Sequence, residues 1–153
     1  MKILMVCLGN ICRSPIAHGI MESKIKKLNL NWTVDSAGTS GWHVGEQPDK
    51  RAIATCKAKG LNIVHQKSRK ITKGDIEYYD VIFAMDANNY NDILRLCQSD
   101  EQKAKVKLMT GYLYPGRNTP IPDPYYDDRF EEVYTLIDLA TDSFLKSMVV
   151  TSP

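Results

Sequence analysis

The chain has 153 residues, of which 43% are hydrophobic and 25% charged, a composition typical of one soluble globular domain. Lys and Arg number 20 and Asp and Glu 18, so the net charge gives no overall attraction to nucleic acid or to a membrane surface. Because the first apolar run, residues 3–8, is shorter than the apolar segment of a signal peptide, we expect a cytoplasmic protein without nucleic-acid or membrane partners.

The chain begins with an apolar run over residues 2–6, which predicts a buried strand that ends in the turn Gly9-Asn10. A helix follows, because Ser14 is a favourable N-cap and Pro15 suits the first helical position. Further apolar runs of strand length occupy residues 32–36, 61–64, 81–85 and 106–109. Further amphipathic helical patterns occupy residues 49–59, 90–97 and 130–148. Strands that alternate with helices predict an α/β fold with a parallel sheet covered on both faces.

Two long segments have no regular pattern. One follows the second predicted strand and contains Gly38, Gly41 and Pro48, and the other contains the prolines between residues 115 and 124. Ligands of open parallel sheets bind beyond the carboxyl ends of the strands, so loops of this kind are often functional. The basic segment 65–73 is interpreted as a solvated face.

The residues between the first strand and the first helix have the pattern of an anion site. Five residues separate Cys7 from Arg13, enough for a loop that turns its backbone N–H groups inward at the start of a helix. Gly9 and Asn10 make this geometry possible, because both tolerate the left-handed backbone conformation, and the Asn10 amide can brace the loop from within. The planar guanidinium of Arg13 then binds two oxygens of a phosphate. We name residues 7–13 the anion loop.

Cys7 is the candidate nucleophile of this loop. Positive charge from Arg13 and from the helix N-terminus favours the thiolate over the thiol, and the Ser14 hydroxyl can donate to the sulfur. Taken alone, Cys7 is equally well an unreactive buried cysteine and Arg13 a surface charge. Their occurrence together with Gly9, Asn10 and Ser14 in one loop favours the catalytic interpretation.

The run CLGNICRSP, residues 7–15, resembles the signature of the low-molecular-weight protein tyrosine phosphatases. Residues 35–39, 85–86 and 123–126 also resemble segments of that family, in the same order, so the resemblance extends over nearly the whole chain. It implies a three-layer α/β fold with a four-stranded parallel sheet and helices on both faces, in a single phosphatase domain over residues 1–153. It also implies metal-independent hydrolysis of phosphotyrosine and aryl phosphates through a phosphocysteine, without a cofactor, and we expect a monomer.

The resemblance also assigns roles to individual residues. Catalysis is assigned to Cys7, Arg13 and Asp123, the last as the general acid for the leaving phenol oxygen. The phosphate contacts are assigned to Leu8, Gly9, Asn10, Ile11, Cys12, Arg13 and Ser14. The walls of the substrate cleft are assigned to Leu8, Trp42, Tyr125 and Tyr126. On local grounds Asp123 is one of several neighbouring acids with solvation or helix capping as the alternative, although the flanking prolines stiffen its loop.

Three supporting roles also follow from the resemblance. Ser36 is expected to hold Asn10, and its alternative role is that of a turn residue at the end of a strand. Asp86 is expected to support the basic site, and its alternative role is the N-cap of the next helix. Cys12 is expected to form a reversible disulfide with Cys7 that protects the thiolate from over-oxidation, and simple packing is the alternative.

The remaining Cys and His residues suggest no chemistry. Cys56 and Cys97 fall on apolar helical stripes, which predicts core positions. Four cysteines without a Cys-x-x-Cys pair favour a reduced protein, and structural disulfides are the alternative. His18, His43 and His65 are well separated, so no metal ligand set is predicted.

Some positions depart from the family pattern, and other functions compete with it. His18 stands where relatives commonly have Glu, and Asp127 and Asp128 stand where Gly is frequent, so the local charge differs. An arsenate reductase of the same fold needs a further cysteine pair, and residues 81–89 contain no cysteine. A non-catalytic phosphotyrosine-binding module is the alternative from another class, although it has no use for a nucleophile, an arginine and an acid together. A P-loop is excluded because no GxxxxGK[ST] run occurs.

Overall fold

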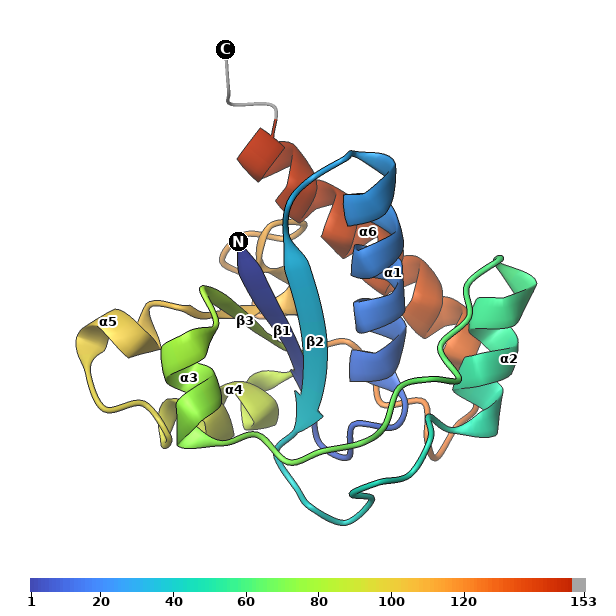
Figure 1. Cartoon of the computed structure of the whole chain (residues 1–153), viewed down its shortest axis with the longest axis horizontal. Helices are drawn as coiled ribbons and strands as arrows, with labels where there is room; N and C mark the ends of the chain where they lie inside the picture. The colour runs from blue at the N-terminus through green and yellow to red at the C-terminus, as the bar shows by residue number, and fades with distance from the viewer. Residues whose placement is uncertain (150–153) are drawn as a thin grey trace.

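The computed structural model describes residues 1–149, and its centre is one parallel sheet (Figure 1). The strands are β1 (Lys2–Cys7), β2 (Thr33–Gly38), β3 (Val81–Ala84) and β4 (Val106–Leu108). Their order in the sheet is β2-β1-β3-β4, and every neighbouring pair is parallel. The expected four-stranded parallel sheet is therefore confirmed.

Helices cover both faces of this sheet. One face is covered by α1 (Arg13–Lys27), α2 (Lys50–Ala58) and α6 (Phe130–Val149). The other face is covered by α3 (Lys73–Tyr78) and α4 (Ala87–Leu94), with α5 (Asp100–Lys103) beyond them. The three-layer arrangement of the prediction is confirmed. No helix within residues 1–149 has the length and apolar character that crossing a bilayer requires.

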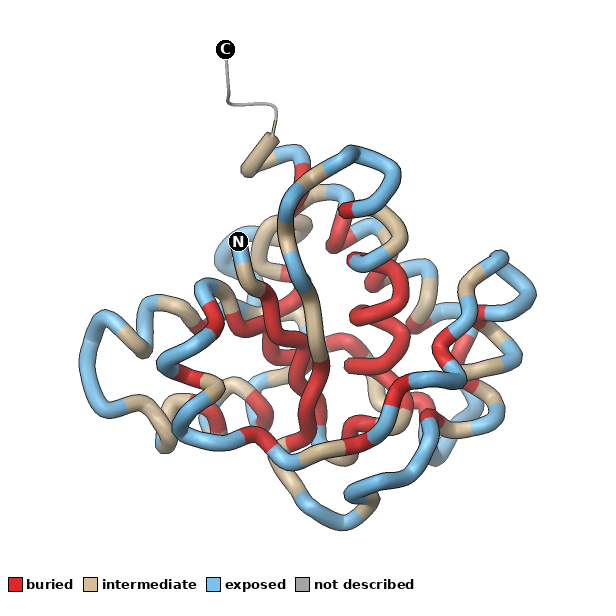
Figure 2. Tube along the Cα trace, in the orientation of Figure 1, coloured by how far each residue is buried: buried red, intermediate tan, exposed pale blue. Residues whose placement is uncertain are grey.

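The strand β1 shows why the sheet is buried on both sides. Ile3 and Met5 pack into the core under α1 and α6, whereas Leu4 and Val6 pack into the core under α3 and α4. Successive side chains of a strand point to opposite faces, so a continuous apolar run fits a strand with helices on both sides. Buried residues are accordingly concentrated along β1 and the inner side of α1 (Figure 2).

The parallel arrangement places the carboxyl ends of all four strands at one edge of the sheet. The anion loop leaves this edge from β1, and Asp86 follows β3 there. The helix η1 (Met109–Gly111) follows β4 at the same edge and leads into an irregular segment with four prolines. Residues 121–128 of that segment, named the acid loop here, return to the anion loop, because Ile121 accepts a hydrogen bond from Arg13.

Several predicted elements differ from the structure. Residues 61–64 form no strand: Ile63 is buried in the core with α1 and α2, and Leu61 packs against the same core while partly exposed. The short helices α3 and α5 were not predicted, since they are largely polar and begin at side-chain caps, Thr72 and Ser99. The helix α1 begins at Arg13 after Cys12, so the predicted N-cap role of Ser14 is wrong.

Candidate active site

The anion loop is held in shape by Asn10. This residue has a φ of 57°, a left-handed conformation that asparagine tolerates. Its side-chain Nδ2 donates to the Ser14 hydroxyl at 2.7 Å, and its Oδ1 accepts from the backbone N of Arg69 at 3.0 Å. The Asn10 amide therefore braces the loop from within, as predicted, and also fastens it to a distant segment.

Gly9 tolerates a left-handed conformation but does not adopt one. The reason for glycine at this position is contact: a Cβ on Gly9 would lie 3.1 Å from Cδ2 of the His43 ring. At that distance the ring would have to move away from the loop. A small residue at position 9 therefore lets His43 pack directly against the backbone of the anion loop.

The Cys7 sulfur lies at the carboxyl end of β1 and faces two donors. The backbone N of Asn10 donates to Sγ at 3.3 Å, and the Ser14 oxygen lies 3.1 Å from Sγ. Because the Ser14 oxygen already accepts a hydrogen bond from Asn10, its own hydroxyl hydrogen is available to the sulfur. Two donors directed at one sulfur stabilise a negative charge on it. Ser14 thus contacts the Cys7 sulfur instead of capping the helix.

Arg13 is almost completely buried, with 3% of its side chain exposed. Its Nη1 donates to Asp86 Oδ2 at 2.7 Å and to the carbonyl oxygen of Ile121 at 2.9 Å. Burial opposes the charge of Arg13, but the neighbouring Cys7, Asp86 and Asp123 outweigh it and raise the pKa of this guanidinium above its usual value. Arg13 therefore stays positively charged beside Cys7.

Asp86 performs both roles that the sequence left open. Its Oδ2 accepts from Arg13, and its Oδ1 accepts from the backbone N of Asn89 at 2.8 Å, which makes it the N-cap of α4. The cap fixes the carboxylate at the end of β3, and the carboxylate in turn orients the guanidinium. Support of the basic site and helix capping are thus one arrangement.

Asp123 lies in the acid loop and approaches Arg13 from the opposite side. Its Oδ2 lies 3.7 Å from Arg13 Nη2, and its Oδ1 accepts from the backbone N of Tyr125 at 3.1 Å. About a third of its side chain, 34%, is exposed. The carboxyl group is therefore accessible to a bound molecule. The hydrogen bond to Tyr125 ties the position of this carboxyl group to the backbone of the acid loop.

One cavity of about 150 Å³ joins these groups. It is lined by Cys7, Leu8, Gly9, Ile11, Cys12, Arg13, Trp42, His43, Asp123, Tyr125 and Tyr126. The structure thus brings together every predicted catalytic and substrate-lining residue. Asn10 and Ser14, also predicted to contact phosphate, are buried behind the sulfur and their side chains do not line the cavity. His43 is an additional lining residue that the sequence analysis missed, although it follows Trp42 directly.

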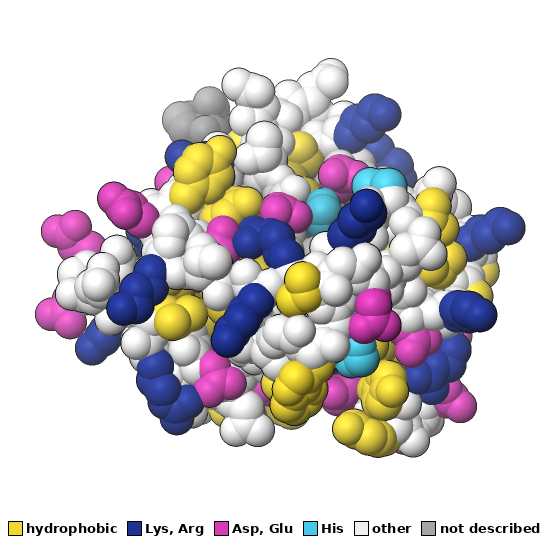
Figure 3. Space-filling view, turned by 60° about the horizontal axis from the view of Figure 1, so that its bottom comes forward, with side chains coloured by type: hydrophobic (Ala, Val, Ile, Leu, Met, Phe, Trp, Pro, Cys, Tyr) yellow, Lys and Arg dark blue, Asp and Glu magenta, His cyan; other side chains and the backbone are white. Residues whose placement is uncertain are grey.

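The mouth of the cavity is apolar and exposed. Trp42 is 75% exposed and Tyr126 is 88% exposed, which is unusual for aromatic side chains. The ring of Tyr125 packs against that of Tyr126 with the centroids 5.0 Å apart. Hydrophobic side chains stand among charged ones on the face that Figure 3 brings forward. Exposed aromatic groups beside a cavity are typical of a binding surface.

Ser36 does not hold Asn10, so this prediction is wrong. Its hydroxyl oxygen lies 3.3 Å from Nδ1 of His18, the residue that departs from the family pattern. The other ring nitrogen of His18 lies 3.4 Å from Glu22. Burial lowers the pKa of His18, and the charges of Glu22 and Asp35 offset only part of this effect. His18 thus engages the serine that the family pattern assigned to the asparagine.

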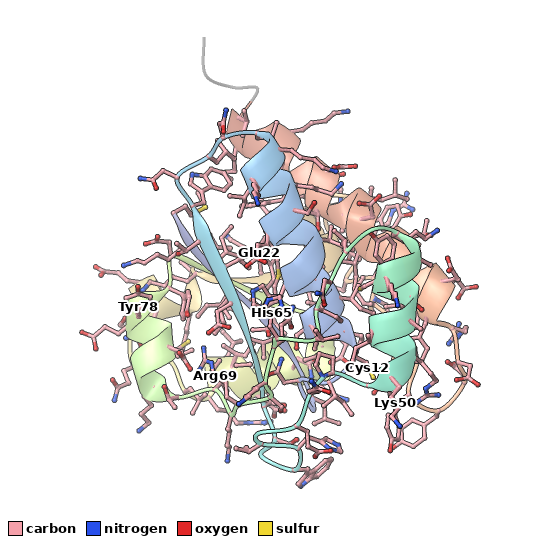
Figure 4. All side chains as sticks on the ribbon, turned by 45° about the vertical axis from the view of Figure 1, so that its right-hand side comes forward. Cys12, Glu22, Lys50, His65, Arg69 and Tyr78 are labelled. Atoms are coloured by element: carbon pink, nitrogen blue, oxygen red, sulfur yellow. The ribbon has the colours of Figure 1, made fainter. Side chains whose placement is uncertain are left out.

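Residues 66–71, named the strap here, hold Asn10 instead. The Ser68 hydroxyl donates to the carbonyl oxygen of Gly9 at 3.0 Å, and Gln66 Nε2 donates to the carbonyl oxygen of Pro15 at 3.2 Å. Arg69 is fixed by ion pairs to Asp35 at 3.2 Å and Asp75 at 2.9 Å; Figure 4 shows its place near β2 and α3. The partners of Gln66 and Ser68 lie beside and in the anion loop. The basic segment 65–73 is therefore not only a solvated face, because part of it holds this loop.

All four cysteines are free thiols. Burial, together with the charge of Asp49, raises the pKa of the Cys12 thiol far above its usual value, and burial raises that of Cys56 to about 12. Cys12 is therefore a neutral thiol in the wall of the same cavity as Cys7. No three His, Cys, Asp or Glu side chains within residues 1–149 are grouped so that they could hold a metal ion.

Comparison with known proteins identifies the family. The model of the family described as "Low molecular weight phosphotyrosine protein phosphatase" matches residues 2–151. The protein of that name from Schizosaccharomyces pombe is 39% identical over 152 residues, which cover 96% of each chain. The chain is also similar in structure to a protein tyrosine phosphatase from Entamoeba histolytica, with a TM-score of 0.89, 36% identity and coverage of 97% and 96%.

A third similar protein has a bound ligand. Vibrio vulnificus Wzb in complex with benzylphosphonate matches with a TM-score of 0.84 and 29% identity, covering 95% of this chain and 97% of that one. The sequence match, the relative and the structures agree with one another and with the geometry of the anion loop. The chain belongs to the low molecular weight phosphotyrosine protein phosphatase family.

Proposed function

We propose that this protein hydrolyses phosphotyrosine in proteins or peptides, and aryl phosphates generally, through a phosphocysteine intermediate and without a metal or cofactor. One observation carries the proposal: a sulfur, a guanidinium and a carboxyl group, those of Cys7, Arg13 and Asp123, converge on one cavity with aromatic walls. Membership of the family supports it.

The first step transfers the phosphoryl group to the enzyme. The Cys7 thiolate attacks phosphorus, the S–P bond forms, and the bond from phosphorus to the phenol oxygen breaks. Asp123, protonated at the start, gives its proton to that oxygen, so the leaving group departs as a neutral phenol. Arg13 and the N–H groups of the anion loop stabilise the charge on the transferring group.

The second step releases phosphate and restores the enzyme. The Asp123 carboxylate accepts a proton from water while the water oxygen attacks phosphorus, and the S–P bond breaks. The electron pair of that bond returns to sulfur, where the Ser14 hydroxyl and the Asn10 N–H stabilise the thiolate. Asp123 ends the cycle protonated, ready for the next substrate.

The walls of the cavity favour an aromatic substrate. Leu8, Ile11, Trp42 and Tyr125 surround the approach to Cys7, and flat apolar side chains pack well against a phenyl ring. A serine phosphate has no ring to fill this space. We therefore propose phosphotyrosine peptides as partners, with phosphate bound in the anion loop. The chain is proposed to work as a cytoplasmic monomer.

Cys12 supplies a means of redox protection. A peroxide oxidises the Cys7 thiolate to a sulfenic acid, the Cys12 sulfur then attacks that sulfur as its proton passes to the departing hydroxide, and water leaves as the disulfide forms. Two thiols reduce the disulfide and restore both cysteines. The proposal is supported by the place of both side chains in the lining of one cavity.

The test is hydrolysis of a phosphotyrosine peptide in EDTA by the wild-type protein and by Cys7→Ser. The wild type should turn over and the variant should show no measurable turnover, because a serine hydroxyl at this position is a far weaker nucleophile than a thiolate. Acid quenching during turnover should trap a phosphocysteine in the wild type only. If neither protein turns over while both bind the peptide, the chain is a binding module and the proposal is wrong.

Asp123→Asn tests the general acid. Its kcat/KM should fall by about 100-fold or more for phenyl phosphate, whose leaving group needs a proton, and much less for p-nitrophenyl phosphate, whose leaving group is stable as an anion. Steady-state kinetics on the two substrates measure this difference. An equal fall for both would show that Asp123 does not donate the proton.

A further inference from the structure

Arg51 binds separate parts of the molecule through one side chain. It lies in the first turn of α2, where its backbone N donates to Asp49, the N-cap, at 2.8 Å. Its guanidinium donates to the same carboxylate through Nε and through Nη2, each at 3.1 Å. A paired contact of this kind fixes the plane of a guanidinium, so the remaining N–H groups point in fixed directions.

Those remaining N–H groups bind the end of the acid loop. Nη1 donates to Asp128 Oδ1, and Nη2 donates to the carbonyl oxygen of Tyr125 at 3.1 Å. The guanidinium carbon also lies 5.6 Å from the ring centroid of Tyr125 and 4.8 Å from that of Phe130. Arg51 thus holds the backbone directly after Asp123 through charge, a hydrogen bond and ring contacts.

The other side of this connection is the anion loop. The backbone N of Asp49 donates to the carbonyl oxygen of Ile11 at 2.8 Å. Figure 4 shows the start of α2, marked by Lys50, close to Cys12 of the anion loop. Arg51 and Asp49 therefore connect the loop that carries the nucleophile to the loop that carries the acid.

The acid loop needs an anchor on this side. Before Asp123, the loop is held at Ile121, whose N donates to Met85 at 2.8 Å and whose carbonyl oxygen accepts from Arg13 at 2.9 Å. After Asp123, no regular structure begins until α6. The Asp123 carboxylate itself accepts from the backbone N of Tyr125, the residue whose carbonyl oxygen Arg51 holds. The position of the carboxylate therefore depends on Arg51.

We infer that Arg51 is a positioning residue for the general acid Asp123. The inference rests on the proposed function and adds a residue that lies outside the catalytic cavity. Its partner Asp128 is one of the two acids at which the sequence departs from the family pattern. In this chain, the additional acid takes part in holding the acid loop.

The experiment compares Arg51→Ala with Arg129→Ala, a matched control. Arg129 is also a partly exposed arginine near the acid loop, but its partners Asp127 and Glu132 are close neighbours in sequence. In Arg51→Ala, kcat/KM should fall by about 10-fold for phenyl phosphate and by less than about 2-fold for p-nitrophenyl phosphate. In Arg129→Ala, both values should stay within about 2-fold of the wild type.

Two further measurements separate positioning from a general structural effect. The inhibition constant of inorganic phosphate should stay within about 2-fold in Arg51→Ala, because the anion loop keeps its own bonds. Addition of Arg51→Ala to Asp123→Asn should change kcat/KM by less than about 2-fold, since the acid through which Arg51 acts is gone. Equal losses for both aryl phosphates, or an additive double variant, would overturn the inference.

Milder variants keep the test valid if Arg51→Ala does not fold. Arg51→Lys keeps a positive charge without the paired contact, and Asp128→Asn removes the charge of one partner at a φ of 58° that Asn tolerates. Both should show the same dependence on the leaving group with a smaller loss. Absence of that dependence in both variants, in the presence of wild-type hydrolysis, would reject the role of Arg51. Absence of hydrolysis by the wild type itself would instead reject the proposed function.

Discussion

At the scale of single residues, His18 and Ser36 form a buried contact beside the anion loop. The His18 ring lies within hydrogen-bond distance of the Ser36 hydroxyl. Asn10 instead accepts a hydrogen bond from the backbone N of Arg69 in the strap. Asn10 keeps its left-handed conformation in this arrangement.

His18 also makes the stability of the protein depend on pH. Burial lowers its pKa in the folded state, where Glu22, Asp35 and His65 are the charged or titratable neighbours, whereas the unfolded value is about 6.5. Below about pH 6.5 the unfolded chain binds the proton first, so the free energy of unfolding falls as the pH falls. Above about pH 6.5 both states hold a neutral ring, and His18 adds no pH dependence.

The variant His18→Gln isolates this effect, because it removes the titration and keeps a polar side chain. Urea unfolding at about pH 7.5 and about pH 5.5 should show a larger loss of stability on acidification for the wild type than for the variant. Equal losses in the two proteins would show that His18 folds with its usual affinity for a proton.

At the scale of elements, the contact between the end of β2 and the anion loop decides the geometry of the site. A Cβ on Gly38 would lie 2.8 Å from the carbonyl oxygen of Leu8 and 3.2 Å from Cβ of Asn10. The backbone of Gly38 also pairs with the strap through Arg69 and Ile71, each at 2.8 Å. Gly38 is therefore enclosed by the anion loop on one side and the strap on the other.

Gly38→Ala should consequently displace the anion loop. We expect a loss of about 1–3 kcal/mol in the free energy of unfolding and a fall of at least about 10-fold in kcat/KM. The matched control is Gly111→Ala, because nothing lies within 4 Å of a Cβ at Gly111. Urea unfolding and steady-state kinetics on both variants provide the measurement. Similar behaviour of the two variants would contradict the argument.

The elements also show what could be predicted from sequence. The core strands, α6 and the anion loop were predicted because apolar periodicity and short-range spacing determine them. The role of the strap was not predicted, because its hydrogen bonds to Gly9 and Asn10 join residues 59 positions apart and leave no local pattern in the sequence. The strand predicted over residues 61–64 is absent, because a short apolar run can pack against a core without pairing with a sheet.

In the candidate active site too, residues in a local sequence pattern could be predicted and residues that act through long-range contacts could not. The catalytic residues were assigned from the run at residues 7–15 and from family resemblance, and the structure places Cys7, Arg13 and Asp123 on one cavity. Arg51 and His43 could not be assigned, because their importance arises from partners that only the fold brings near. The partner of Ser36 was predicted wrongly because it was assigned from the family resemblance, whereas Ser36 contacts His18, a position at which this chain departs from the family pattern.

At the scale of the whole molecule, the parallel sheet separates the ends of the chain from the cavity. The strand β1 begins beside Met1 and ends at Cys7, so the N-terminus lies at the edge of the sheet opposite the anion loop. The end of α6 at Val149 lies at that same opposite edge (Figure 1). A protein immobilised on a solid support through Met1 would therefore present its cavity to the solution, and large phosphorylated proteins could reach Cys7 without obstruction from the support.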